Sequence, residues 1–175
     1  MADIKSTLEL VMEKTRHLHM TDEDKRKQAA QAFKEAVSRL AGRYLNRQID
    51  LEKFKAELNQ LGEGTASDKA DAAAEIGRRI DPAADNKVLL DLMRDGLGLD
   101  ISGIEATLRH FRKMLHSDEG LARERIRVDL SKKGISGTAV IPNPGADKDW
   151  TERRREMFEA VKLELTARIA QLTEG

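Results

Sequence analysis

Residues of low polarity recur every three or four positions along most of the chain, the spacing that places them on one face of an α-helix. The series with this spacing are Ile4, Leu8, Val11, Thr15 and Leu18; Ala30, Phe33, Val37, Leu40 and Tyr44; Leu51, Phe54, Leu58 and Leu61; Val88, Leu89, Leu92 and Met93; Ile104, Leu108, Phe111 and Leu115; and Trp150, Met157, Val161, Leu165, Ile169 and Leu172. Each series predicts an amphipathic helix.

Residues that favour helix ends lie beside most of these series. Side chains of Ser, Thr and Asp accept hydrogen bonds from the free N–H groups of a first turn, and acids there complement the helix dipole. The expected capping residues are Thr21, Asp50, Asp81 before Pro82, Ser102 with Glu105, and Asp149 with Glu152, which puts Trp150 at a first helical position. We expect Gly62, in the left-handed conformation, Gly96 and Gly134 to end helices.

The alanine-rich stretch 66–80 has only Ile76 and Ile80 as large hydrophobic residues. A helix with so small a face either packs closely against its neighbours or packs weakly, and the sequence leaves both alternatives open.

The series that starts at Ile104 keeps its phase as far as Leu130. It predicts one helix over residues 103–133, about 45 Å long, unless Gly120 breaks it. With the helix that follows Asp149 it would form a long C-terminal hairpin. The fold class expected is therefore all-α, a bundle of about six amphipathic helices. We assign residues 1–175 to one domain, with a candidate internal boundary at 62–64.

Between the two hairpin helices, residues 134–146 form a run without charge that holds two of the three prolines. Thr138–Ile141 is the best β-strand candidate of the chain, and Asn143-Pro144-Gly145 is typical of a turn. We expect a short extended segment at the hairpin tip. The candidate residues for binding a protein partner are Ile135, Val140, Ile141, Pro142 and Trp150. Two alternatives remain: the segment folds back over the bundle end, or it is disordered.

Composition excludes several kinds of chemistry. The absence of cysteine excludes disulfides, thiolate metal sites and a cysteine nucleophile. The four histidines lack metal-ligand spacing, and neither a phosphate-binding glycine loop nor a paired acid and base is found. We therefore expect a protein that is not an enzyme and holds no metal or cofactor. The sequence shows no secretory signal or membrane-spanning run, so we expect a cytoplasmic protein without a membrane partner.

The 31 basic and 31 acidic residues give a formal net charge of zero. A cationic surface for nucleic acid, as in a ribosome-associated protein, is the alternative function. The arginines that would form it are Arg109, Arg112, Arg123, Arg127, Arg153, Arg154 and Arg155. Acidic residues are interleaved with them at helical spacing, which favours a solvated, neutralised face over nucleic-acid binding.

Few side chains are large and apolar, so a single copy has limited area to bury. We expect a homo-oligomer or a complex. The function that the sequence favours is that of a non-enzymatic interaction protein, a scaffold or adaptor, with 134–146 as its docking element and a protein partner that the sequence does not identify.

Overall fold

The computed structural model describes residues 21–62 and 65–172. The helix expected over residues 4–18 lies outside them. The described chain contains α2 (Asp22–Leu45), α3 (Leu51–Leu61), α4 (Ala66–Gly77), α5 (Lys87–Asp91), the π-helix η1 (Leu92–Gly96), α6 (Ser102–Lys132), the 3₁₀ turn η2 (Pro144–Ala146) and α7 (Lys148–Gln171). These are six α-helices with no strand among the described residues, which confirms the all-α fold.

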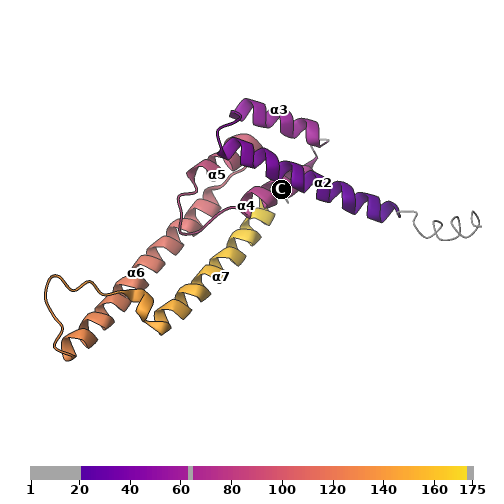
Figure 1. Cartoon of the computed structure of the whole chain (residues 1–175). Coiled ribbons are helices and arrows are strands. Elements are labelled where there is room, and N and C mark those ends of the chain that lie inside the picture. Colours follow the sequence, from indigo (N-terminus) through magenta and orange to yellow (C-terminus); the bar gives the residue numbers. More distant parts are fainter. Residues whose placement is uncertain (1–20, 63–64, 173–175) are drawn as a thin grey trace, which may run out of the picture.

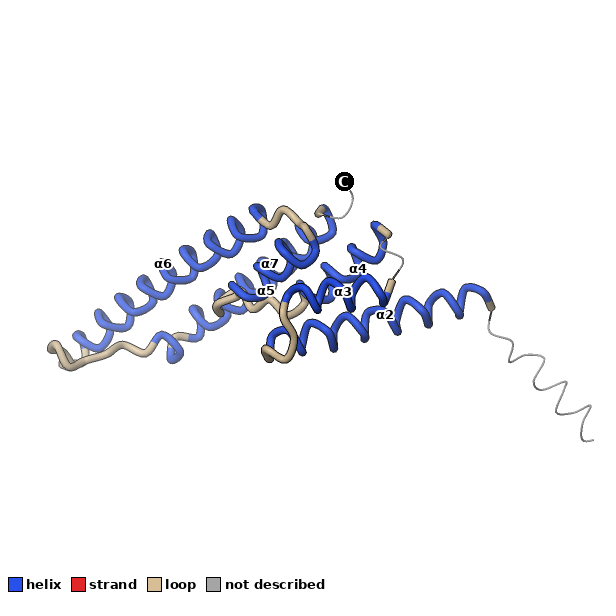
Figure 2. The backbone as a smooth tube through the Cα atoms, turned by 90° about the horizontal axis from the view of Figure 1, so that it is seen from above, coloured by secondary structure: helices blue, strands red, loops and turns tan. Residues whose placement is uncertain are grey.

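The helices form a compact body from which a long hairpin extends (Figure 1). Helices α2 and α3 lie beside each other at one end of the molecule, close to α4 and α5. Helices α6 and α7 run antiparallel and carry the chain away from this body. Figure 2 shows the same division from above.

The core of the body is built from the predicted series. Phe54, Ile76, Leu92, Met93 and Ile104 are all buried almost completely. Their side chains come from α3, α4, η1 and α6, so one cluster joins elements from both ends of the sequence.

The alanine-rich helix α4 packs closely, which settles the alternative that its sequence left open. Ala72, Ala73 and Ile76 have no exposed surface. A Cβ atom on Gly77 would lie only 2.2 Å from Cδ1 of Ile169 on α7. Small side chains therefore allow α4 to approach its neighbours at short range.

Helix α6 continues through Gly120, as its periodicity predicts, and ends at Lys132. Gly134 follows with a φ of +77°, a conformation that glycine adopts at little cost. The Ile135 N–H donates to the Leu130 carbonyl, at 3.0 Å, which closes the helix end. The predicted stop at Gly134 is confirmed.

The predicted caps at Thr21 and Asp50 are confirmed. The Thr21 hydroxyl accepts from the Asp24 N–H, and the Asp50 carboxylate accepts from the Lys53 N–H at 2.8 Å. Gly62 ends α3, but its φ of −132° is extended, so the predicted left-handed conformation is wrong. A Cβ there would lie 2.8 Å from the Asp68 carboxylate, so close approach to that side chain accounts for the glycine.

The expected helix start at Asp81-Pro82 is wrong, because residues 81–86 form turns and α5 begins only at Lys87. The buried Asn86 side chain donates to the carbonyls of Asp81 and Ala84. Arg112 of α6 donates to the Pro82 carbonyl at 3.2 Å and to the Ala84 carbonyl at 2.5 Å. These bonds hold the turns and compete with a helix.

Two capping boxes are also wrong. Ser102 is the first residue of α6 rather than its cap, and its N–H donates to the Asp100 carboxylate at 3.0 Å, while Glu105 bonds to Arg94. Helix α7 is capped by Asp147, two residues before Asp149, so Trp150 is the third helical residue. Three residues assigned to apolar faces, Ala30, Leu61 and Val88, are exposed.

Candidate protein-interaction site

Four contacts set the register of the hairpin. From the body outward they join Thr107 to Glu164 (2.8 Å), the rings of Phe111 and Phe158 (centroids 4.9 Å apart), Asp118 to Arg153 (3.5 Å) and Arg125 to Asp147 (3.2 Å). Helix α7 begins level with Arg125, so about the last two turns of α6 extend beyond it. We call residues 118–153 the hairpin tip.

The segment that joins the two helices turns back along α6 towards the start of α7 (Figure 1). Its first half contains a turn in which the Val140 N–H donates to the Gly137 carbonyl, at 3.2 Å. Gly137 has a φ of +122°, which is unfavourable for other residues. The expected strand over 138–141 is wrong, because this turn interrupts it and the described chain offers no strand with which it can pair.

The second half of the segment is anchored. Pro142 and Pro144 are buried. The Asn143 side chain accepts from the Gly145 N–H at 3.0 Å, and the Asp147 carboxylate accepts from the Trp150 N–H at 3.1 Å. The Trp150 N–H and, to a smaller extent, Arg125 hold the pKa of Asp147 below its ordinary value. An ionised Asp147 thus ties the segment to both helices.

The five predicted partner-binding residues differ in how far they are exposed. Ile141 is 85% exposed and Ile135 is 48% exposed. Val140 and Trp150 are half-buried, and Pro142 is buried. Pro142 therefore anchors the segment, while the two isoleucines present apolar surface at the tip.

Sequence reasoning missed a second set of exposed hydrophobic residues, Met114, Leu121 and Val128 on α6. They are seven residues apart and so lie in one row along the helix, beside the face that packs on α7. Their seven-residue spacing could have predicted this row from the sequence. It was overlooked because the series through Leu108 and Phe111 has more residues in the same helix. Leu121 and Val128 thus add exposed apolar side chains to the tip.

Polar atoms without partners also gather at the tip. Among the described side chains, three buried polar atoms lack a hydrogen bond: Asp118 Oδ2, Trp150 Nε1 and Arg153 Nη2. Buried polar groups are normally paired, because an unpaired one costs about 1–3 kcal/mol. The tip thus holds two donors and one acceptor that its own fold does not use.

The arginines of the alternative, nucleic-acid function mostly have contacts within the chain. Arg123 bonds to Glu119 at 2.6 Å, and Arg127 to Glu124 at 2.8 Å. The Arg154 guanidinium lies over the rings of Trp150 and Phe158, at 5.8 and 4.8 Å.

Arg153 pairs with Asp118, and Arg112 bonds to backbone carbonyls. Arg109 and Arg155 are exposed. The structure therefore does not assemble the seven arginines into one uncompensated cationic surface.

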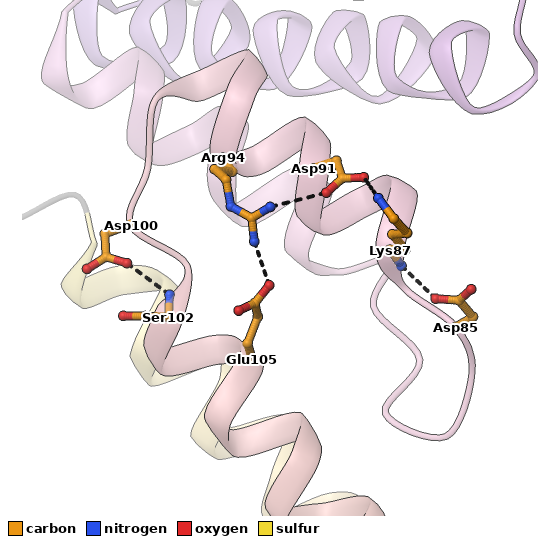
Figure 3. A network of polar contacts seen from close by, with 7 residues as sticks. All are labelled: Asp85, Lys87, Asp91, Arg94, Asp100, Ser102 and Glu105. Atoms are coloured by element: carbon orange, nitrogen blue, oxygen red, sulfur yellow. Dashed lines mark hydrogen bonds and ion pairs between the residues drawn. The ribbon is translucent and has the colours of Figure 1, made fainter.

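A second polar cluster links α5 and η1 to the start of α6 (Figure 3). Asp91 accepts from Lys87 at 2.5 Å and from Arg94 at 3.3 Å, and Arg94 also bonds to Glu105 at 2.5 Å. The Asp91 carboxylate raises the pKa of Lys87. Asp91 and Glu105 pair with Lys87 and Arg94, while Asp85 and Asp100 accept from backbone N–H groups. This is the arrangement of a structural network.

Over residues 21–62 and 65–172, no group of three or more His, Asp or Glu side chains is placed to hold a metal ion. In the same part of the chain, no helix combines the length and the apolar character that crossing a bilayer requires.

Fold and site together define an all-α protein whose hairpin tip carries exposed apolar side chains. Compared with known proteins, the chain matches no family model, no curated protein and no solved structure.

Proposed function

We propose that this protein is a cytoplasmic, non-enzymatic scaffold or adaptor that binds another protein through its hairpin tip. One observation carries the proposal: Ile141, 85% exposed, lies next to the buried Pro142 on an uncharged segment. The buried Pro142 holds Ile141 in an exposed position. Burial of the Ile141 side chain therefore stabilises the protein only when a partner covers it.

The size of this gain is useful for binding. Full burial of an isoleucine side chain contributes about 1.5–3 kcal/mol. The anchored second half of the segment reduces the conformational entropy that docking would cost. Because residues 134–146 carry no charge, a partner can cover them without desolvating an ion.

Three unpaired polar atoms are buried within the hairpin tip. Trp150 Nε1 and Arg153 Nη2 are donors, and Asp118 Oδ2 is an acceptor. Because each of these atoms is buried, a partner that docks on the tip would contact the exposed residues around them rather than the atoms themselves.

The test compares two variants in which an exposed apolar residue is replaced by aspartate. Ile141→Asp changes the tip, while Leu163→Asp changes a 73% exposed residue of α7 that lies nearer the body. Tagged chains are used to recover partners from native lysate, with circular dichroism as the folding control. We expect Ile141→Asp to lose a protein that wild type and Leu163→Asp both retain. Equal recovery by all three chains would remove the tip from the proposal.

A further inference from the structure

An apolar groove lies at the other end of α7 from the hairpin tip. It encloses a cavity of about 640 Å³ between α4 and α7. The α4 wall consists of small residues, including Ala70, Ala74 and Gly77, and the α7 wall includes Leu165 and Ile169. A cavity of this volume has room for large side chains of a further helix.

The charged residues at the rim of this groove already have partners. Asp71 pairs with Lys34 at 3.2 Å, Arg78 with Glu75 at 3.0 Å and Lys162 with Glu159 at 3.5 Å. A charged ligand would have to displace these pairs, whereas an apolar one would not. The groove therefore suits an apolar helix face.

The chain itself carries such a face. Residues 1–20 lie outside the described residues, and Ile4, Leu8, Val11 and Leu18 predict an apolar stripe there. They lead into the N-terminal part of α2, in which every residue from 21 to 32 is exposed. In Figure 2 this part of α2 extends beyond α3 and α4, as an arm.

Thr21, the first described residue, lies well before the point at which α2 reaches α4. Helix α2 reaches α4 at the Lys34–Asp71 ion pair, 13 residues after Thr21, or about 20 Å along a helix. A helix over 4–18 is about 21 Å long, so if it folded back along α2 it would end level with Asp71. It would meet only the near end of a groove that continues to Arg78.

We propose that the groove between α4 and α7 binds the N-terminal segment of a second copy of this chain, and that two copies exchange these segments reciprocally. Two equivalent contacts related by a twofold axis form a closed dimer. They also double the buried area, which brings it towards the size of a stable interface. This inference does not depend on the function proposed for the hairpin tip.

Sedimentation of the full-length chain tests the exchange. Wild type should sediment as a dimer. Leu8→Asp/Val11→Asp, which alters the segment, and Ala74→Arg, which fills the groove from an exposed position, should each sediment as monomers. Ala56→Arg, at an exposed alanine of α3 outside the groove, is the matched control and should remain dimeric. Circular dichroism establishes that each variant is folded.

A mixture of the two monomeric variants separates segment exchange from other modes of association. Ala74→Arg keeps an intact segment, and Leu8→Asp/Val11→Asp keeps an intact groove. Their mixture should therefore form a heterodimer through one remaining contact, weaker than the wild-type dimer. A monomeric wild type, dimeric variants, or a mixture that stays monomeric would each overturn the proposal.

Discussion

The body and the hairpin tip use the same two helices in different ways. Near the body, Ile104 and Leu108 of α6 and Leu165 and Ile169 of α7 are buried in a continuous core. At the tip, only Ala122, Pro142 and Pro144 are buried, and the helices are joined mainly by ion pairs. Burial of apolar side chains therefore stabilises mainly the body, while several apolar side chains of the tip stay exposed in the folded chain. Substitutions in the two regions should differ accordingly.

The largest effect is expected in the body, at Phe54. Its ring has no exposed surface and lies 5.9 Å from the ring of Tyr44, centroid to centroid. Phe54→Ala should lower the free energy of unfolding by about 3–5 kcal/mol, because it leaves a cavity in the core. Urea unfolding followed by circular dichroism measures this change. A loss below about 1 kcal/mol would contradict the division between body and tip.

A smaller effect is expected at Asp118, where the hairpin tip begins. Asp118→Ala removes the partner of Arg153, whose Nη2 is already buried without a hydrogen bond. We expect a loss of about 1 kcal/mol in the same assay. The double variant Asp118→Leu/Arg153→Leu leaves neither charge without its partner and should be at least as stable as Asp118→Ala. A double variant less stable than Asp118→Ala would show that the unpaired Arg153 does not cause the loss of stability.

Acid should loosen the tip through Asp147. Since its pKa in the folded chain lies below the ordinary value of 3.8, the ionised carboxylate favours the folded state. This contribution is complete above pH 3.8 and is lost as the pH falls through the lower folded value. Trp150, the sole tryptophan, reports the change by fluorescence.

The control for this pH effect is Asp147→Asn, which keeps a capping side chain but does not titrate. Its Trp150 emission should change less below pH 3.8 than that of wild type. Identical acid titrations of the two chains would assign the effect to other carboxylates.

The smallest effect on stability is expected at Ile141, the most exposed large hydrophobic residue of the described tip. Ile141→Asp should change the free energy of unfolding by no more than about 0.5 kcal/mol, because this side chain is 85% exposed and its loss opens no cavity. Thermal unfolding of Ile141→Asp and of wild type, followed side by side, measures this change. A loss as large as that of Phe54→Ala would mean that Ile141 supports the fold.

Most of the helices were predictable because they bury a face whose period the sequence displays. The continuity of α6 through Gly120 followed from phase alone. The turns at 81–86 were not predictable, since they depend on Arg112, about thirty residues away, whose hydrogen bonds to the Pro82 and Ala84 carbonyls no local pattern reveals.

The site was predictable in part. The lack of charge in 134–146 identified the segment, but sequence cannot decide which of its apolar residues points inward. Pro142 is buried and the adjacent Ile141 is exposed because η2 and the Asp147 cap fix the direction of the chain. The gathering of Asp118, Trp150 and Arg153 depends on the register of α6 against α7, which is a tertiary property.

A photo-crosslinking amino acid placed at position 141 tests the central claim most directly, with position 163 as the comparison. In native lysate, position 141 should give one discrete adduct with another protein, and excess wild-type chain should suppress it. Position 163 should give no such adduct. Failure of position 141 to form an adduct, or the same adducts from both positions, would contradict a partner-binding tip.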